Sequence, residues 1–107
     1  MDSVIVKEVS VRIFKQIVLM HCVVVGSHAL HRLNAAQRQI FHEGTLLKML
    51  AQEIPKFVGL QRNGRYAAFF RKKQGFIKII TEIKEDKLEI VTFMKTGGIP
   101  KRWEQKN

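Results

Sequence analysis

The chain has 107 residues, which suffices for one domain with a single hydrophobic core. Its only cysteine, Cys22, excludes a disulfide framework and a thiolate-based metal site, and its apolar surroundings predict a buried free thiol. The net charge is +10, and residues 56–107 contribute most of it, with 13 Lys and Arg against 5 Asp and Glu. This asymmetry favours a polyanionic partner, nucleic acid or an acidic protein, over a basic surface that has no such partner.

Two apolar segments begin the chain. Residues 4–14 alternate loosely between apolar and polar side chains and predict a half-buried strand. Residues 17–25 are apolar apart from His21 and predict a second strand, buried on both sides. This run is too short to span a bilayer, and the charged residues before it extend too far for a signal peptide. We therefore expect a cytoplasmic protein without a membrane segment, whose first two strands either cover one face of a later sheet or extend its edge.

Two helices are expected next. Ser27 is suited to cap a helix over residues 28–43, and Gly44 is expected to end it. Thr45 can cap a second helix over residues 46–54, which a proline then ends. Both segments have apolar residues at helical spacing, so each helix should bury one stripe.

The stretch from Phe57 to Lys95 predicts four short strands joined by tight turns at Asn63-Gly64, Gln74-Gly75 and Glu85-Asp86. These turns fix the register and so divide the side chains between two faces. One face is almost wholly apolar and should be the core: Phe57, Tyr66, Ala68, Phe70, Ile77, Ile79, Thr81, Ile83, Leu88, Ile90, Thr92 and Met94. The other face has an apolar centre of Val58, Leu60, Ala67, Phe69, Ile80, Val91 and Phe93, and a charged rim of Arg62, Arg65, Arg71, Lys78, Glu82 and Glu89.

The predicted fold is α+β, with two helices packed on an antiparallel β meander and an extra N-terminal strand pair. Residues 1–107 should form a single domain, made of N-terminal strands (1–26), a core (27–96) and a mobile basic tail (97–107). Within the core we expect Phe70, Ile79 and Ile90 to be buried against Leu33, Ile40 and Leu50.

The chain contains HALHR at residues 28–32, a helix ending in Ile-Pro, NGRYAAFFRKK at 63–73, and IKIITEIKEDKLEIVTFMKT at 77–96. These motifs resemble those of small BrnT-like proteins of the RelE/ParE toxin superfamily. The resemblance covers about residues 27–96. It implies a RelE-like fold and a metal-independent ribonuclease of a toxin–antitoxin pair, with an acidic antitoxin protein as partner. The chain departs from the family pattern in a longer spacing after the histidine and in its additional N-terminal strands, and either change could alter or abolish catalysis.

Cleaving RNA without a metal requires a base, cations that stabilise the phosphate, and an acid. His28 and Arg32 lie four residues apart, on one face of the predicted helix, and would combine a base or acid with a phosphate anchor. The alternative is that His28 only makes a local hydrogen bond. Glu82 is a second candidate base, although a cross-strand ion pair with Arg65 competes for it. No cofactor or metal is expected, because the sequence has neither a Gly-rich phosphate loop nor ligands at metal-site spacing.

Arginine and lysine side chains should hold the RNA backbone, because the guanidinium group binds phosphate bidentately. The candidates are Arg62, Arg65, Arg71, Lys72, Lys73, Lys78, Lys101 and Arg102. Phe69 lies among them in sequence and could stack on a base. The first hypothesis is therefore a toxin-type ribonuclease. The alternatives are a non-catalytic module that binds nucleic acid or protein, and a structural protein that forms a homodimer through its exposed sheet face.

Overall fold

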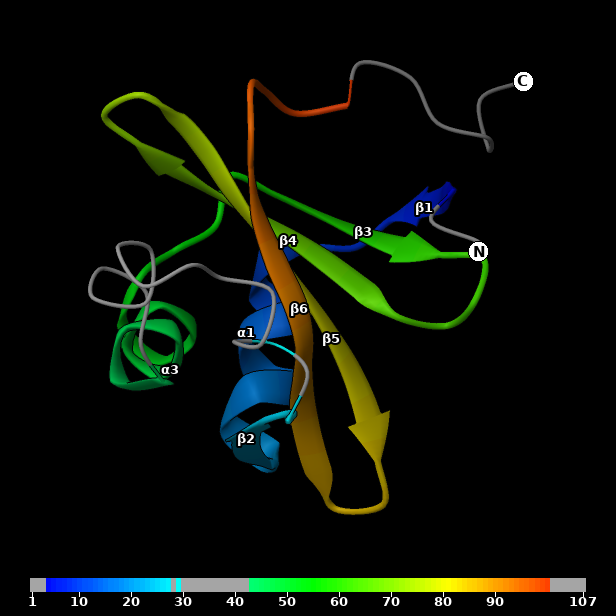
Figure 1. Ribbon diagram of the computed structural model, residues 1–107. Helices are drawn as coiled ribbons and strands as arrows, with labels where there is room; N and C mark the ends of the chain where they lie inside the picture. Colours follow the sequence, from blue (N-terminus) through cyan, green and yellow to red (C-terminus); the bar gives the residue numbers. More distant parts are fainter. Residues whose placement is uncertain (1–3, 28, 30–42, 101–107) are drawn as a thin grey trace.

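The computed structural model describes residues 4–27, 29 and 43–100. Within this part of the chain a six-stranded sheet has two helices on one face (Figure 1), so the α+β class is confirmed. The strand order is β1-β3-β4-β5-β6-β2, and neighbours are antiparallel except β2 and β6, which are parallel. The elements are β1 (Ile5–Glu8), α1 (Val11–Met20), β2 (Cys22–Val25), α3 (Glu43–Gln52), β3 (Phe57–Gln61), β4 (Tyr66–Lys72), β5 (Gly75–Lys84) and β6 (Lys87–Thr96).

The N-terminal strand pair predicted over residues 4–25 is wrong, because residues 11–20 form α1. The Ser10 side chain caps this helix by accepting a hydrogen bond from the backbone N–H of Ile13, at 3.3 Å. Phe14 and Val18 are one helical turn apart and both are buried, so the apolar run forms a helical stripe rather than a strand face. The strands on either side do not pair with each other: β1 lies beside β3 and β2 beside β6, so both extend the edges of the sheet.

The start of β2 corrects a second expectation. Cys22 is exposed there, and its thiol is not the buried one that the apolar run predicted. His21, just before it, is half-buried, and its Nδ1 is 2.7 Å from the carbonyl oxygen of Ile17, so the ring is held by the end of α1.

Helix α3 begins before its predicted start and ends before its predicted end, and Gly44 lies inside it instead of ending the preceding helix. The helix predicted over 28–43 lies outside the described residues except at Ala29 and at Glu43, which belongs to α3. Lys15 of α1 donates to the carbonyl oxygens of Leu50 at 2.5 Å and Glu53 at 2.9 Å. Carbonyls at a helix C-terminus have no partner within the helix, so Lys15 joins the two helices by satisfying them.

The four-stranded meander is confirmed, but its first turn is one residue longer than predicted. The backbone N–H of Gln61 donates to the carbonyl of Arg65 at 2.8 Å, and Gly64 takes a φ of +90°. A three-residue loop that ends in such a glycine shifts the register by one residue. The predicted faces of β3 are therefore wrong: Val58 faces the helices and Phe57 faces away.

The β4–β5 turn and a bulge in β6 had different effects on the predicted faces. The β4–β5 turn is Lys73-Gln74, one residue earlier than expected, which moves the pairing by two residues and leaves both faces as predicted. On β6, Val91 is an extra residue opposite β5. This bulge turns Phe93 toward the helices and places Thr92 and Met94 on the other face, contrary to prediction.

Hydrophobic clusters lie on both faces of the sheet. The larger one packs the sheet against α1 and α3 and includes Phe70, Ile79, Ile90 and Leu50, all buried as predicted; their other expected partners, Leu33 and Ile40, lie outside the described residues. The smaller cluster consists of Ile5, Phe57, Ala67, Phe69 and Ile80, with Phe76, Val91 and Ile99 packed against it. We call the face that carries it the far face. No described helix packs on it, and Ile99 shows that residues 97–100 are not simply a mobile tail.

Candidate nucleic-acid interface

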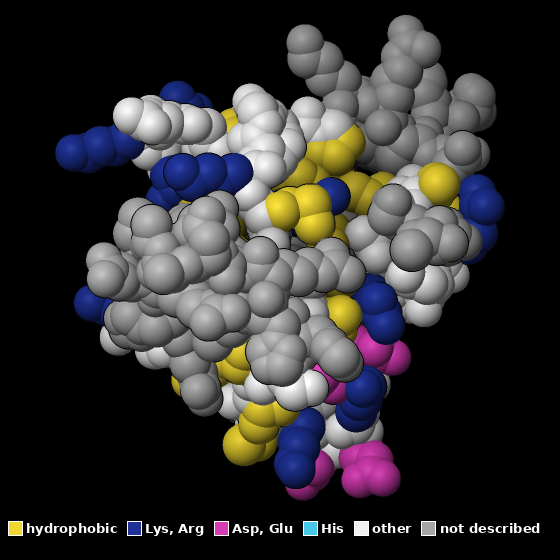
Figure 2. Space-filling model, viewed as in Figure 1, with side chains coloured by type: hydrophobic (Ala, Val, Ile, Leu, Met, Phe, Trp, Pro, Cys, Tyr) yellow, Lys and Arg dark blue, Asp and Glu magenta, His cyan; other side chains and the backbone are white. Residues whose placement is uncertain are grey.

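Charged side chains divide between the two ends of the long β4–β5–β6 sheet region. Residues 82–89, around the β5–β6 turn, hold four carboxylates and two lysines. Figure 2 shows these acidic side chains at the lower end of the molecule, where Figure 1 places that turn. Toward the β4–β5 turn lie the cations that we call the basic end: Arg71, Lys72, Lys73, Lys78 and Lys95. The positive potential of the described residues is therefore concentrated at the basic end.

Two cations of the basic end lie over aromatic rings on the far face. The Arg71 guanidinium is 5.6 Å from the centre of the Phe76 ring, and Lys78 Nζ is 5.7 Å from the centre of the Phe69 ring. At this range each ring attracts its cation and restricts where it points. Phe69 is only 3% exposed and cannot take a base, contrary to the sequence-based expectation. Phe76 is half-buried beside the exposed Arg71, so it is the more accessible of the two rings.

Sequence reasoning missed Phe76 as a candidate. Phe76 lies opposite Arg71 only in the observed register, because the predicted turn at Gln74-Gly75 sets Lys73 opposite Phe76 instead. Residues opposite each other in an antiparallel pair point to one face and lie within side-chain contact.

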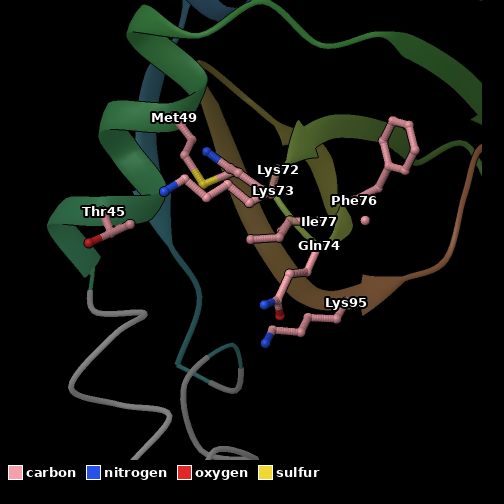
Figure 3. A pocket seen from close by; sticks show the side chains of 9 residues that line it. Thr45, Met49, Lys72, Lys73, Gln74, Phe76, Ile77 and Lys95 are labelled. Carbon is pink, nitrogen blue, oxygen red and sulfur yellow. The ribbon is translucent and has the colours of Figure 1, made fainter.

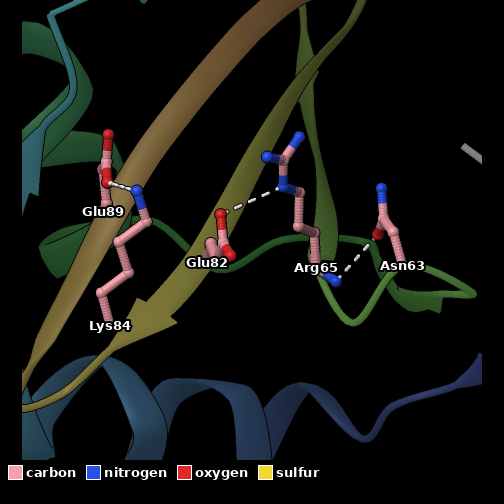
Figure 4. Close-up of polar contacts among 5 residues, drawn as sticks. All are labelled: Asn63, Arg65, Glu82, Lys84 and Glu89. Atoms are coloured by element: carbon pink, nitrogen blue, oxygen red, sulfur yellow. Dashed lines mark hydrogen bonds and ion pairs between the residues drawn. The ribbon is translucent and has the colours of Figure 1, made fainter. Parts of the chain in front are cut away.

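Glu82, the candidate base on the sheet, is held by an ion pair. Its carboxylate accepts from Arg65 Nε at 3.2 Å (Figure 4), as the competing interpretation predicted. Glu82 lies directly opposite Glu89, and like charges in that position repel. Glu89 has its own cation, because Lys84 Nζ is 2.8 Å away, and this hydrogen bond raises the pKa of Lys84. The arrangement balances the two carboxylates instead of leaving either unpaired.

The predicted cations fall into three groups. One group meets at the basic end and comprises Arg71, Lys72, Lys73 and Lys78. A second group, Arg62 and Arg65, lies at the β3–β4 turn, at the opposite end of β4. There the Asn63 side chain accepts a hydrogen bond from the backbone N–H of Arg65 (Figure 4). The third, with the candidate helix site, lies outside the described residues: Lys101, Arg102, His28 and Arg32. The structure thus gathers only part of the predicted set.

In the described part of the chain, no group of three His, Cys, Asp or Glu side chains is arranged to hold a metal ion. Among the described helices, none is long and apolar enough to cross a membrane.

No protein-family model, curated protein or solved structure matches this chain significantly. The resemblance to the RelE/ParE superfamily is therefore a hypothesis.

Proposed function

We propose that this protein binds RNA on the far face at its basic end, and that it acts as a toxin-type, metal-independent ribonuclease of a toxin–antitoxin pair. The observation that carries the binding proposal is the cluster of Arg71, Phe76 and Lys78 on neighbouring strands. It supplies two cations for phosphates beside a half-buried ring on which we expect a base to stack. The positive potential concentrated at the basic end favours the approach of RNA there.

The energetics favour single-stranded RNA over a duplex. Stacking a base on an aromatic ring contributes about 1–3 kcal/mol, and it needs a base that is not already paired and stacked. Arg71 is held over Phe76, so its guanidinium is partly oriented before RNA arrives. Since a guanidinium can bind phosphate bidentately, Arg71 should contribute more than Lys78, which acts as a point charge.

Binding is tested with fluorescence anisotropy on a labelled single-stranded RNA over a range of salt concentrations. The double variant Arg71→Gln/Lys78→Gln should bind more weakly, and the slope of log affinity against log salt should fall by about two units. The matched control is Lys7→Gln/Lys87→Gln, which removes the same charge at exposed positions on β1 and at the β5–β6 turn. Equal losses in both double variants, or no loss in either, would contradict an interface at the basic end.

Cleavage is the second part of the proposal and rests on the resemblance. His28 would act as base or acid and Arg32 as phosphate anchor, with Glu82 the next candidate. His28→Ala should lower cleavage by about 10²–10⁴-fold with little change in binding, whereas Arg32→Ala should impair both. If wild-type protein binds RNA without cutting it, the non-catalytic module is the better description. Growth arrest on expression, relieved by the product of a neighbouring gene, would support the toxin and its acidic antitoxin.

A further inference from the structure

We infer a second binding site, for a nucleoside monophosphate, in the pocket between α3 and the β4–β5 hairpin. The pocket has a volume of about 390 Å³, within the range of about 300–1,000 Å³ that is typical of small-molecule sites. Thr45 and Met49 of α3 form one wall, and the hairpin together with Lys95 of β6 forms the other (Figure 3). This site is on the helix side of the sheet. Phe76 of the RNA interface also lines this pocket, but its ring points away from Met49 and Lys73 in Figure 3, and the inference rests on the other lining residues and not on RNA binding.

The charge of the pocket is positive and only partly balanced. Three lysines line it, and Lys72 is neutralised by the Glu53 carboxylate, with contacts of 2.7 and 2.9 Å. Lys73 and Lys95 are exposed, and neither is ion-paired with a described carboxylate. A phosphate monoester carries about −1.5 to −2 charges near pH 7, which matches these two cations.

The remaining surface of the pocket is suited to a ring. Most of the surface that the pocket exposes is apolar, with the buried Met49 and Ile77 of the larger hydrophobic cluster in its lining, and we call this surface the apolar floor. Gln74, on the same side of Ile77 as Lys95 in Figure 3, has amide donors and acceptors that can bind polar groups on the edge of a base.

These two halves of the pocket select one class of ligand. Inorganic phosphate would satisfy the lysines but leave the apolar floor uncovered, and a nucleoside would cover the floor but leave the cations unmatched. A nucleotide satisfies both. It can be a free nucleoside monophosphate or the phosphorylated terminal nucleotide of an RNA, because the chemistry that the pocket recognises is the same.

The test is isothermal titration calorimetry of the full chain with adenosine 5′-monophosphate, cytidine 5′-monophosphate, adenosine and inorganic phosphate. We expect a nucleotide to bind more tightly than adenosine and phosphate. Lys73→Gln/Lys95→Gln should weaken nucleotide binding by about tenfold or more, since each lost contact involves a charged group. Lys7→Gln/Lys87→Gln, which removes the same charge elsewhere, should leave it unchanged. Binding no tighter than that of inorganic phosphate, or equal binding by the two double variants, would overturn the inference.

Two further arms separate this site from the RNA interface and identify the source of the nucleotide. Arg71→Gln/Lys78→Gln should retain nucleotide binding, and a loss as large as that of Lys73→Gln/Lys95→Gln would contradict a separate site. A short RNA with a terminal phosphate is then compared with the same RNA without it. If the phosphate strengthens binding and Lys73→Gln/Lys95→Gln removes the difference, the pocket holds an RNA end. If it does not, while a mononucleotide still binds, the ligand is the free nucleotide.

Discussion

Thr81 is the residue whose substitution tests the packing most directly. It is fully buried on the helix face of β5, and in the described part of the chain its hydroxyl has no hydrogen-bond partner. Burying a hydroxyl without a partner costs about 1–3 kcal/mol by mutational data. Valine has nearly the same shape and a similar preference for strands, so Thr81→Val removes this cost while keeping the packing. The free energy of unfolding should therefore rise by about 1–2 kcal/mol.

The assay is urea denaturation followed by circular dichroism, together with thermal melting. A gain of 1 kcal/mol should raise the melting temperature by about 4–8 °C in a domain of this size. Thr81→Ser keeps the hydroxyl and removes the methyl group, and should lower stability by about 0.8 kcal/mol. Thr92→Val, at a half-buried position on the far face, is the control and should change stability little. If Thr81→Val is instead less stable than wild type by 1 kcal/mol or so, the hydroxyl makes a hydrogen bond and the reasoning fails.

Two other predictions concern the β3–β4 loop and the junction of the helices. Gly64→Ala should lower the free energy of unfolding by about 1 kcal/mol, because a φ of +90° strains any residue with a Cβ. The control is Gly97→Ala, which also meets open space but lacks a positive φ and should leave the free energy of unfolding unchanged. Equal melting curves for the two variants would contradict the loop geometry. Lys15→Met should cost about 1 kcal/mol by removing the hydrogen bonds to Leu50 and Glu53. Burial lowers the pKa of Lys15 below 10.5, despite the opposing charge of Glu53. In the pH window just below 10.5 the unfolded chain therefore holds more protons than the folded chain, and the contribution of Lys15 to stability increases as the pH rises. A stability advantage of wild type over Lys15→Met that shrinks as the pH rises would contradict this sign.

The meander could be predicted because its signals are local. Asn63-Gly64, the other turn pairs and the β-branched residues between them act within a few residues of each other. The side-chain period of two then gave the faces of β4 correctly, even though the second turn lies one residue earlier than expected. The same rule failed for β3 and for the second half of β6. One extra residue in the β3–β4 loop, or in the β6 bulge, exchanges the two faces of the strand segment beyond it relative to its partner strand. A local pattern does not show where that residue is inserted.

The sequence by itself determined the α+β class, the meander and the basic character of residues 56–107. Only the tertiary structure decided that residues 11–20 are a helix, because their β-branched residues suit a strand as well as a helix. Packing favours the helix, in which the ring centres of Phe14 and Tyr66 are 6.0 Å apart. It also decided which cations act together. Register placed Arg71 beside Phe76 and committed Arg65 to Glu82, while the packing of α3 against the sheet brought Lys95 into a pocket with Lys73. The number of charges is a property of the sequence, but their neighbours depend on strand pairing and helix packing, which join residues far apart in the chain.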